Sequence, residues 1–349
     1  MHNPNLIPLS RRSFGQWSTL TLRVVVISTL IGGLIGLLRA EDAPLTSLII
    51  GGLSGTLIGF GCTVCELALF SNPDLRIARK LPALALMGLR AVGYAVVITV
   101  GLALPAWLLN GVLPWQDGDF LGGFAVSALV AMGISTAIEI MRLLGTEATA
   151  ALLSGRYYRA RLENRVILVA DVVGSTRLGE ELGELRFHAF LRDVAQDLAL
   201  PVDRTRGDVH RYVGDAVIVT WPQERGLRDG ACLSCALGMH QILAQQTDMY
   251  RNRYGHAPTV RVALHCGQVA AGEIGDWKKE IALLGDTMNT TARIENAARD
   301  LGVTTILSDA VRKGLPPQLS EGLSSLPAYV AAGKSAALKL WTPDPKSKH

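Results

Sequence analysis

Two acidic residues occupy places where the sequence predicts that β-strands end. The mostly apolar run 165–170 predicts a buried strand, and Asp171 follows it directly, ahead of a turn of small residues at 172–176. Asp215 lies in the tight turn of a predicted hairpin over 209–221. A single Asp in a turn is usually there to form the turn. As a pair beside a Gly-Ser-Thr turn with free backbone amides, these carboxylates are typical of a site for divalent metal ions and a polyphosphate.

A second pair of residues that could take part in chemistry is Asn289 and Arg293. The pattern around them predicts a helix over 287–300, and residues four apart share one face of a helix. An amide and a guanidinium side by side suit a sugar or ring oxygen and a phosphate, because arginine offers a fixed fork of donors and stays charged. Alone the pair is a weak signal, since Asn and Arg on a helix are usually only solvated.

Composition divides the chain into two regions. Its 349 residues are enough for two or more domains. The hydrophobic content of 49% is concentrated before about residue 141. The formal net charge is +4 without a dense Lys/Arg cluster, which argues against a nucleic-acid partner.

Four apolar stretches in the first region are long enough to cross a membrane, which takes about 20 helical residues. They are 20–38, 46–69, 83–109 and 120–140. Basic residues precede the first stretch and follow the second and the fourth, while the other two links are acidic. The positive-inside bias therefore predicts a multi-pass protein of the inner (plasma) membrane with both termini in the cytoplasm.

Small and charged residues in these stretches predict helix contacts. Glycines recur every four residues in the first two stretches, which allows close approach either inside one bundle or between two chains. Charged residues also lie in or near the spans, and a pair between Arg90 and a carboxylate that helps to set the bundle is favoured over an ion path. The glycines are Gly32, Gly36, Gly51, Gly55 and Gly59, and the charged residues are Glu66, Arg90 and Glu139.

From about residue 164, predicted strands alternate with predicted helices. This order predicts one α+β domain with a largely antiparallel sheet. The predicted helices are 177–199, 225–250 and 287–300, and the predicted strands are 165–171, the hairpin 209–221, 260–266, 268–274, 279–284, 304–307 and a closing hairpin over 328–341.

Three motifs in this region resemble those of the class III nucleotidyl cyclase catalytic domain. They are Asp171-x-x-Gly-Ser-Thr, Tyr212-x-Gly-Asp215 and Gly285-Asp-Thr-x-Asn289-x-x-x-Arg293. Together, in this order and spacing, they are specific, and the resemblance covers roughly residues 155–342. It implies a ferredoxin-like catalytic domain with flanking helices, placed after an all-α membrane domain of four helices.

The resemblance also implies roles for single residues. Asp171 and Asp215, with the Val172 carbonyl, would hold two Mg²⁺ or Mn²⁺ ions per site. Asn289 and Arg293 would be catalytic, orienting the ribose and stabilising charge on the phosphoryl group. In this family the two acids come from one chain and Asn and Arg from the other, so a homodimer with sites at the interface is implied. The residues implied to bind the substrate, ATP, are Val173, Gly174, Ser175, Thr176, Arg211, Ala282 and Lys334.

Two of these positions depart from the family pattern. Members specific for ATP have Lys four positions before the second metal Asp, and Asp or Thr three positions before the Gly of the third motif. This chain has Arg211 and Ala282 there. Guanylate-specific members have Glu and Cys, which are absent too. The Ala282 side chain cannot accept a hydrogen bond, and Glu280, two residues earlier on the same strand face, is the nearest substitute acceptor.

The sequence thus predicts a membrane-bound homodimeric adenylate cyclase that converts ATP to 3′,5′-cyclic AMP and pyrophosphate. Two alternatives stay open: a catalytically silent cyclase-like module that relays a membrane signal, and a cyclase of relaxed or guanylate specificity. The predicted domains are a membrane domain at 1–141, a linker helix at 142–163, the catalytic domain at 164–342 and a disordered tail at 343–349.

Overall fold

The computed structural model divides into two compact units, one within Ser10–Ile140 and the other within Met141–His349. We call them the helical unit and the sheet unit. The structure describes residues 12–38, 40, 43–66, 83–111, 115, 120–144, 149, 154–277, 279–330 and 337–343.

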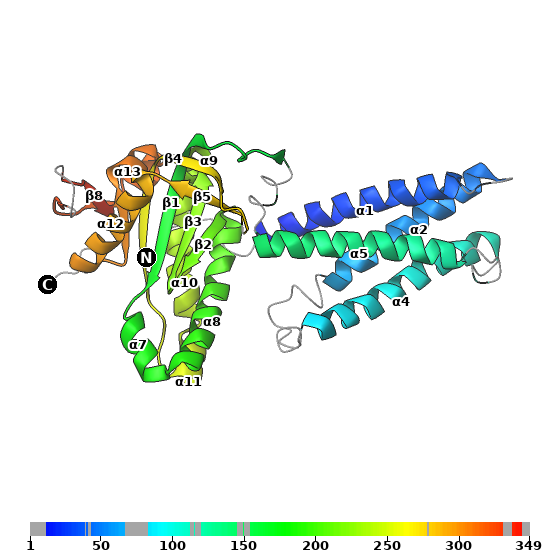
Figure 1. Ribbon diagram of the computed structural model, residues 1–349, viewed down its shortest axis with the longest axis horizontal. Helices are drawn as coiled ribbons and strands as arrows, with labels where there is room; N and C mark the ends of the chain where they lie inside the picture. Colours follow the sequence, from blue (N-terminus) through cyan, green and yellow to red (C-terminus); the bar gives the residue numbers. More distant parts are fainter. Residues whose placement is uncertain are drawn as a thin grey trace. The chain divides into compact units, whose positions relative to one another are not determined.

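An eight-stranded sheet forms the centre of the sheet unit (Figure 1). The strand order is β2-β3-β1-β4-β6-β8-β7, and β5 pairs with β4 beside this path. Neighbouring strands are antiparallel except β4 and β6, which are parallel. The predicted α+β domain with a largely antiparallel sheet is therefore confirmed. The strands are β1 (Arg161–Val172), β2 (Asp208–Val213), β3 (Ala216–Pro222), β4 (Val260–Ile274), β5 (Glu280–Leu284), β6 (Thr305–Ser308), β7 (Ser324–Ser325) and β8 (Leu340–Thr342).

The helices of the largest core cover one face of this sheet, and α12 (Asp286–Asp300) packs on the opposite face, where its Ile294 meets Ala263 of β4. Alternate residues of a strand point to opposite faces, and the even-numbered residues of β1 face a large apolar core. That core joins Val166 and Leu168 of β1 to Val194 of α8 and Met239 of α10. The helices are α7 (Ser175–Leu182), α8 (Glu184–Arg204), α9 (Gln223–Leu227), the 3-10 turn η3 (Arg228–Gly230), α10 (Ala231–Gln245), α11 (Thr247–Tyr254), α12 (Asp286–Asp300), α13 (Asp309–Gly314) and α14 (Pro317–Ser320).

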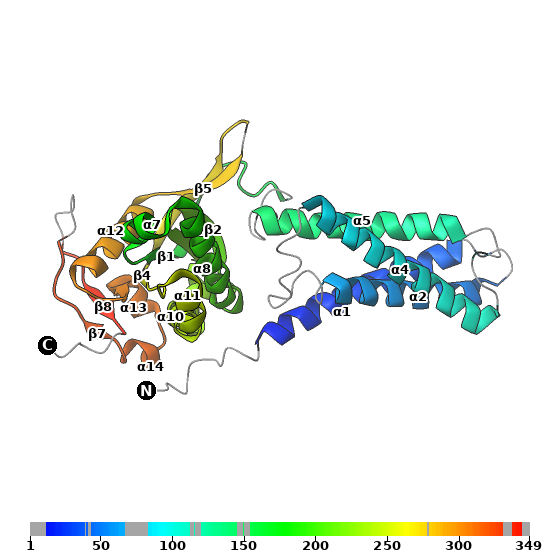
Figure 2. The ribbon, with the colours of Figure 1, turned by 90° about the horizontal axis from the view of Figure 1, so that it is seen from below.

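The opposite face of the sheet has a smaller core. Ile167 of β1 packs there with Tyr157 and with Leu283 of β5, while Val169 and Ile218 beside them are only partly buried. The last residues of β4 pair with β5, and together they extend from the body of the sheet as an arm, which Figure 2 shows. The odd-numbered residues of β1 therefore lie on the face that the helices of the large core leave uncovered.

One predicted strand break is wrong. The predicted strands 260–266 and 268–274 are the single strand β4. Gly267 does not form a turn there. A side chain at this position would collide with Thr287 of α12, so the glycine allows the helix to pack closely on the strand.

Two predicted helices are divided by residues with positive φ. The helix predicted over 177–199 is α7 and α8, because Gly183 between them has a φ of 72°. The helix predicted over 225–250 is divided at Asp229 and Gly230, with φ values of 56° and 64°. A left-handed residue interrupts the helical hydrogen-bond ladder, so each helix ends at that point.

Among its described residues the helical unit has four helices, and three of them contain segments long and apolar enough to cross a membrane by length and composition. These segments are Thr21–Leu38, Pro44–Cys65 and Gly88–Asn110. The fourth predicted span corresponds to α5, whose described apolar segment, Phe120–Thr136, is shorter. The helices are α1 (Arg12–Leu38), α2 (Pro44–Cys65), α4 (Ala83–Asn110) and α5 (Phe120–Leu144).

The glycine faces of the first two helices meet within one chain. A side chain on Gly32 or Gly36 would collide with the backbone of α2, and one on Gly51 or Gly55 would collide with the backbone of α1. Of the two interpretations that the sequence left open for these four glycines, contact inside one bundle is the one observed.

The predicted pair between Arg90 and a carboxylate is present. Arg90 Nε lies 3.5 Å from Glu66 Oε1, and both residues are buried. The same oxygen accepts hydrogen bonds from the hydroxyls of Tyr94 (2.6 Å) and Ser135 (3.3 Å). This carboxylate therefore ties the end of α2 to α4 and α5. The side chain of Glu139 lies outside the described part of the chain.

Candidate active site

Asp171 is positioned by the regular alternation of β1. It lies two residues beyond Val169, on the sheet face that α8 and α10 do not cover. Its Cα partner in the neighbouring strand is Arg261 of β4. The Asp171 side chain is 18% exposed, so the carboxylate is largely, but not fully, withdrawn from water.

Asp215 is brought to Asp171 by a two-residue hairpin turn. Val213 pairs with Ala216, which confirms the predicted hairpin. Gly214 in the turn has a φ of 61°, a conformation that favours glycine in tight hairpins. Because β3 also pairs with β1, the turn ends beside the last residues of β1. Asp215 lies close enough to Asp171 for its negative charge to act on that carboxyl group.

The surroundings of Asp171 oppose its ionisation. Burial and the negative charges of Asp215 and Glu295 raise the pKa of Asp171 from 3.8 to about 6. The charge of Arg261 acts in the opposite direction and is outweighed. Carboxylates pressed together in this way are stabilised by a bound cation, so the arrangement favours a metal ion.

Three further charged residues near Asp171 were missed by the sequence analysis. Arg261 Nη1 lies 3.7 Å from Asp171 Oδ2 and 2.9 Å from Glu295 Oε1. Arg299 Nη2 lies 3.9 Å from the same Asp171 oxygen. Arg261 is opposite Asp171 only because β1 and β4 pair in this register, which a single sequence does not reveal. The four-residue spacing of Glu295 and Arg299 was the one available signal, and it is common on helix surfaces.

Of the residues after Asp171 that are implied to bind ATP, Val173 does not offer its backbone amide to a phosphate. Val172 is the last residue of β1 and its side chain is buried. The Val173 amide donates to the Thr259 carbonyl at 2.9 Å. That amide is therefore already used, and it is not available to a phosphate in this conformation.

The next three residues, Gly174, Ser175 and Thr176, are better suited to binding phosphate. Gly174 has a φ of 71° and stands at the N-terminal cap of α7, which begins at Ser175. Amides in the first turn of a helix have no acceptor within the helix. The amides of Ser175 and Thr176 are therefore the ones that can bind an anion, with help from the helix dipole.

The helix α12 carries Asn289 and Arg293 on a different side from the residues that meet Asp171. Glu295 and Arg299 are the α12 residues near Asp171. At 3.6 residues per turn, Arg293 lies about 200° around the axis from Glu295, and Asn289 lies near Arg293. Asn289 is exposed and Arg293 is half-buried. Within the described part of the chain, no hydrogen bond or ion pair joins either residue to Asp171.

Arg211 reaches the same sheet face as Asp171 through a β-bulge. Val209 pairs with Val219, whereas Arg211 pairs with the adjacent β3 residue, Ile218. One residue of β2 is therefore extra, and a bulge of this kind turns the following side chains to the other face. Without it, Arg211 would share the face of Val209, toward the large core. With it, Arg211 shares the face of Ile218, which belongs to the smaller core.

The remaining predicted substrate residues are placed as follows. Arg211 Nη2 lies 2.7 Å from Glu280 Oε1, and both side chains are about two-fifths exposed, at 42% and 41%. Ala282 of β5 is buried. Lys334 lies outside the described residues.

The donor set fits a hard divalent cation. Among the described residues, no group of three or more His, Cys, Asp or Glu side chains could hold a metal ion, so Asp171 and Asp215 are a two-carboxylate pair. Mg²⁺ is typically held by one or two carboxylates together with substrate phosphates and water. The pair therefore suits an ion that arrives with, or is completed by, a phosphorylated substrate.

The segment that holds these residues matches a known family. Residues 157–319 match the model described as the adenylate and guanylate cyclase catalytic domain. The match begins at Tyr157 and includes both carboxylates and all of α12. This segment is a class III nucleotidyl cyclase catalytic domain.

Related sequences carry the same kind of domain. Adenylate cyclase 2 of Rhizobium meliloti (strain 1021) is 36% identical over 231 residues, covering 64% of this chain and 64% of that protein. The adenylate cyclase of Anabaena cylindrica is 25% identical over 188 residues, covering 52% of this chain and 37% of that protein. The chain thus spans less than two thirds of the length of these curated relatives.

A solved structure shows the same fold. The structure of a bacterial light-regulated adenylyl cyclase aligns with a TM-score of 0.54 at 19% sequence identity, covering 62% of this chain and 64% of that chain. The predicted fold class, a cyclase catalytic domain after a helical region, is therefore confirmed.

Proposed function

We propose that this chain is a membrane-bound homodimeric adenylate cyclase that converts ATP to 3′,5′-cyclic AMP and pyrophosphate. The observation that carries the proposal is the close pair of carboxylates, Asp171 and Asp215, inside a cyclase domain. A relative named adenylate cyclase 2 at 36% identity supports ATP as the substrate. The reaction is attack of the ribose 3′-oxygen on the α-phosphorus with loss of pyrophosphate.

Asp171, Asp215 and the Val172 carbonyl hold two Mg²⁺ or Mn²⁺ ions in each site. Such ions, when bound, make the ribose 3′-hydroxyl more acidic and neutralise charge on the triphosphate. The raised pKa of Asp171 supports this assignment, because a cation relieves the repulsion between the two carboxylates.

Other residues orient the substrate and stabilise the developing charge. The first-turn amides of α7, at Ser175 and Thr176, hold phosphate oxygens. Asn289 orients the ribose, and Arg293 stabilises the charge that develops on the phosphoryl group, since a preorganised guanidinium is worth most where charge appears in the transition state. Arg261, 3.7 Å from Asp171, adds a positive charge beside the phosphate-binding region.

A second copy of the chain completes each site. Asn289 and Arg293 lie on the far side of α12 from Glu295 and Arg299, the residues that meet Asp171. Asp171 is also on the less covered face of the sheet, where Val169 is only partly buried. Two chains arranged head to tail bring Asn289 and Arg293 of one to the carboxylates of the other, which gives a closed dimer with two equivalent sites.

The helical unit anchors the enzyme in the inner membrane. Three of its helices contain segments long and apolar enough to span a bilayer, and α5 (Phe120–Leu144) is the fourth span. Basic links on one side and acidic links on the other support a cytoplasmic position for both termini and therefore for the cyclase domain.

One observation favours a second candidate, a catalytically silent module that binds nucleotide and relays a signal. The base-recognition positions carry Arg211 and Ala282 rather than the residues of ATP- or GTP-specific members. Against it stand the two carboxylates and the Asn289–Arg293 pair, since a silent domain has no chemical need for all four.

Turnover by the full-length protein separates the two candidates. In membranes with Mn²⁺, we expect the wild type to convert ATP to cyclic AMP and pyrophosphate, the two products forming in equal amounts. Asp171→Ala should lose almost all of this activity. Glu181→Ala is the control, because Glu181 is a half-exposed carboxylate in a surface pair with Arg177. A wild type that forms no cyclic nucleotide from ATP or GTP, or an Asp171→Ala variant with full activity, overturns the enzyme proposal.

A further inference from the structure

We propose that Glu280, held by Arg211, reads the base of the nucleotide and selects adenine. This inference rests on the proposed function and adds to it the residue that decides the base. The starting observation is the ion pair between Arg211 Nη2 of β2 and Glu280 Oε1 of β5 at 2.7 Å. The pair joins the strand that leads to Asp215 to the strand that leads to α12, with its Asn289 and Arg293.

The fold places Arg211 for this task by a specific device. The bulge in β2 turns Arg211 from the helix-covered face to the face that carries Asp171. An arginine kept only as a solvated surface residue has no need of this irregularity. Bulges commonly re-aim a side chain beside a functional site.

The pair is accessible and has unused hydrogen-bonding capacity. Both side chains are about two-fifths exposed, so a ligand can reach them. Arg211 has five N–H donors and uses one of them on Glu280. Within the described part of the chain, no other partner is recorded for either side chain. The pair therefore offers donors of Arg211 next to Glu280 Oε2, a single free acceptor oxygen.

Adenine matches this donor–acceptor pair on either of its polar edges. Its N6 amino group is a donor that lies next to an acceptor nitrogen, N1 on one edge and N7 on the other. Arg211 donates to the ring nitrogen while Glu280 Oε2 accepts from the amino group. The ring nitrogen and the amino group of that edge then each have a partner in the pair.

Guanine does not match as well. Its N7–O6 edge shows two acceptors and no donor, which leaves Glu280 facing lone pairs. On its other edge, O6 and N1–H are an acceptor beside a donor, which Arg211 and Glu280 Oε2 can match. The N2 amino group next to N1 is a second donor, however, and Glu280 has one oxygen left after pairing with Arg211. Ala282, the next residue on this side of β5, is buried and has a methyl side chain, so it accepts nothing. An unpaired polar group in a site is the main source of discrimination between related substrates.

The pair thus gives a chain with Ala282 at an expected acceptor position another way to prefer ATP. The acceptor lies at Glu280, one strand repeat earlier, and Arg211 fixes its orientation. Glu280 is a specificity residue that contacts the base, and Arg211 is both a donor to the base and the group that positions Glu280.

Binding of nucleotides to the full-length protein in nanodiscs tests this inference independently of turnover. The probes are ATP and GTP in the presence of Mn²⁺, competed against a fluorescent ATP analogue. We expect the wild type to bind ATP more tightly than GTP. In Glu280→Ala the ATP-to-GTP affinity ratio falls about tenfold or more, because one donor of adenine loses its acceptor. Glu280→Gln, which keeps one acceptor oxygen, retains part of the ratio.

The control is Glu181→Ala, whose carboxylate has the same 41% side-chain exposure and also pairs with an arginine. Its ratio should equal that of the wild type. The inference is overturned if the wild type does not prefer ATP, or if Glu280→Ala keeps the wild-type ratio. Failure of the proposed function gives a different result. The protein would then form no cyclic nucleotide, while the binding experiment would still measure its base preference.

Discussion

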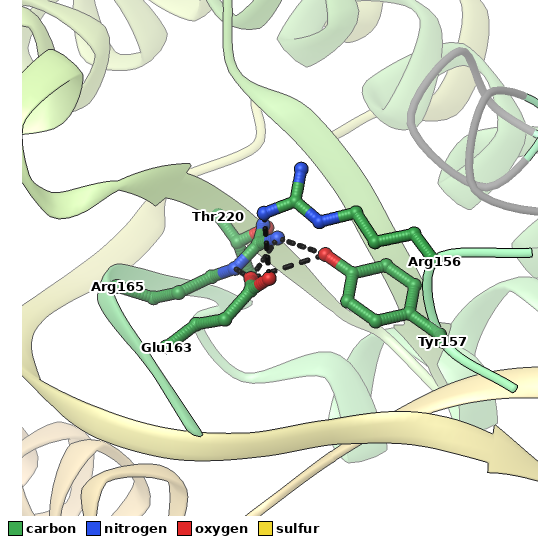
Figure 3. Close-up of polar contacts among 5 residues, drawn as sticks. All are labelled: Arg156, Tyr157, Glu163, Arg165 and Thr220. Atoms are coloured by element: carbon green, nitrogen blue, oxygen red, sulfur yellow. Dashed lines mark hydrogen bonds and ion pairs between the residues drawn. The ribbon is translucent and has the colours of Figure 1, made fainter. Parts of the chain in front are cut away.

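The two ends of β1 carry charged clusters on the same face of one strand, and the clusters differ in how well their charges are matched. At the start of the strand, Glu163 accepts from Arg165 Nη2 at 2.8 Å, from the Tyr157 hydroxyl at 3.0 Å and from Arg156 Nη2 at 2.7 Å (Figure 3). At the end of the strand, the negative charges of Asp215 and Glu295 act on Asp171, and the positive charge of Arg261 does not outweigh them.

The pKa values of the two acids record this difference. Burial opposes ionisation of Glu163, but the hydrogen bond and charge of Arg165, the hydroxyl of Tyr157 and the charge of Arg156 outweigh it, so the pKa of Glu163 is lowered. For Asp171, burial and neighbouring carboxylates act together, and the pKa rises to about 6. A cluster whose charges are balanced by the protein serves the fold, and one with an excess of negative charge suits a cation.

The largest expected effect comes from removing a carboxylate at the unbalanced end. Asp215→Ala should lower kcat with ATP about 10³-fold, because the loss of metal-borne stabilisation of the transition state amounts to several kcal/mol. Its thermal midpoint should not fall, since removing Asp215 relieves the repulsion on Asp171. Initial rates and thermal unfolding of the same preparation measure both quantities. Loss of activity together with a lower midpoint would show that Asp215 is structural.

The balanced end should respond in the opposite manner. Glu163→Ala removes the main partner of Arg165, whose side chain is 3% exposed. Loss of one member of a buried pair costs about 3 kcal/mol, which lowers the thermal midpoint of a domain of this size by roughly 6–12 °C. The kcat of the folded protein at a temperature well below the midpoint should stay within about twofold of the wild type. A stable but inactive Glu163→Ala variant contradicts the structural role.

The smallest expected effect is a difference in how stability depends on pH, measured in EDTA. Asp171 has a folded pKa above its unfolded value, so its contribution to stability is complete below about pH 4 and is lost as the pH rises toward about 6. Glu163 has a folded pKa below its unfolded value of 4.5, so its contribution is present above that pH and is lost as the pH falls.

Two amide variants make this difference measurable. Relative to the wild type, Asp171→Asn should become more stable as the pH rises from about 4 to 7, whereas Glu163→Gln should become less stable as the pH rises from about 3 to 5. Thermal midpoints across this range give both slopes. Parallel profiles for the two variants would remove the contrast between the two ends of β1.

The sequence predicted the strands that carry the acids and the turn that brings them together. It did so because an alternating apolar strand that ends in Asp171 and a Gly-Asp turn before β3 are local patterns. The single strand β4 was missed, since a glycine needed for helix packing looks the same in a sequence as a glycine in a turn. Gly267 is of the first kind, as its contact with Thr287 shows.

The charged surroundings of the acids could not be predicted, because they depend on register and on the rotation of α12. Arg261 faces Asp171 through strand pairing. Glu295 reaches Arg261 through the packing of α12, and its charge acts on Asp171. The bulge that re-aims Arg211 is likewise a departure from the regular alternation on which sequence reasoning relies. Local spacing identified the chemical groups, and long-range packing decided which of them meet.

The central claim, that each site draws its carboxylates from one chain and its Asn289–Arg293 pair from another, is tested most directly by mixing two inactive variants. Asp171→Ala and Arg293→Ala, each inactive alone, are co-expressed at full length in one membrane. In a mixed dimer one of the two sites has all of its residues, so random pairing should restore about a quarter of the wild-type activity per dimer. No activity above that of the separate variants, with mixed dimers demonstrated by co-purification through two different tags, would contradict the account.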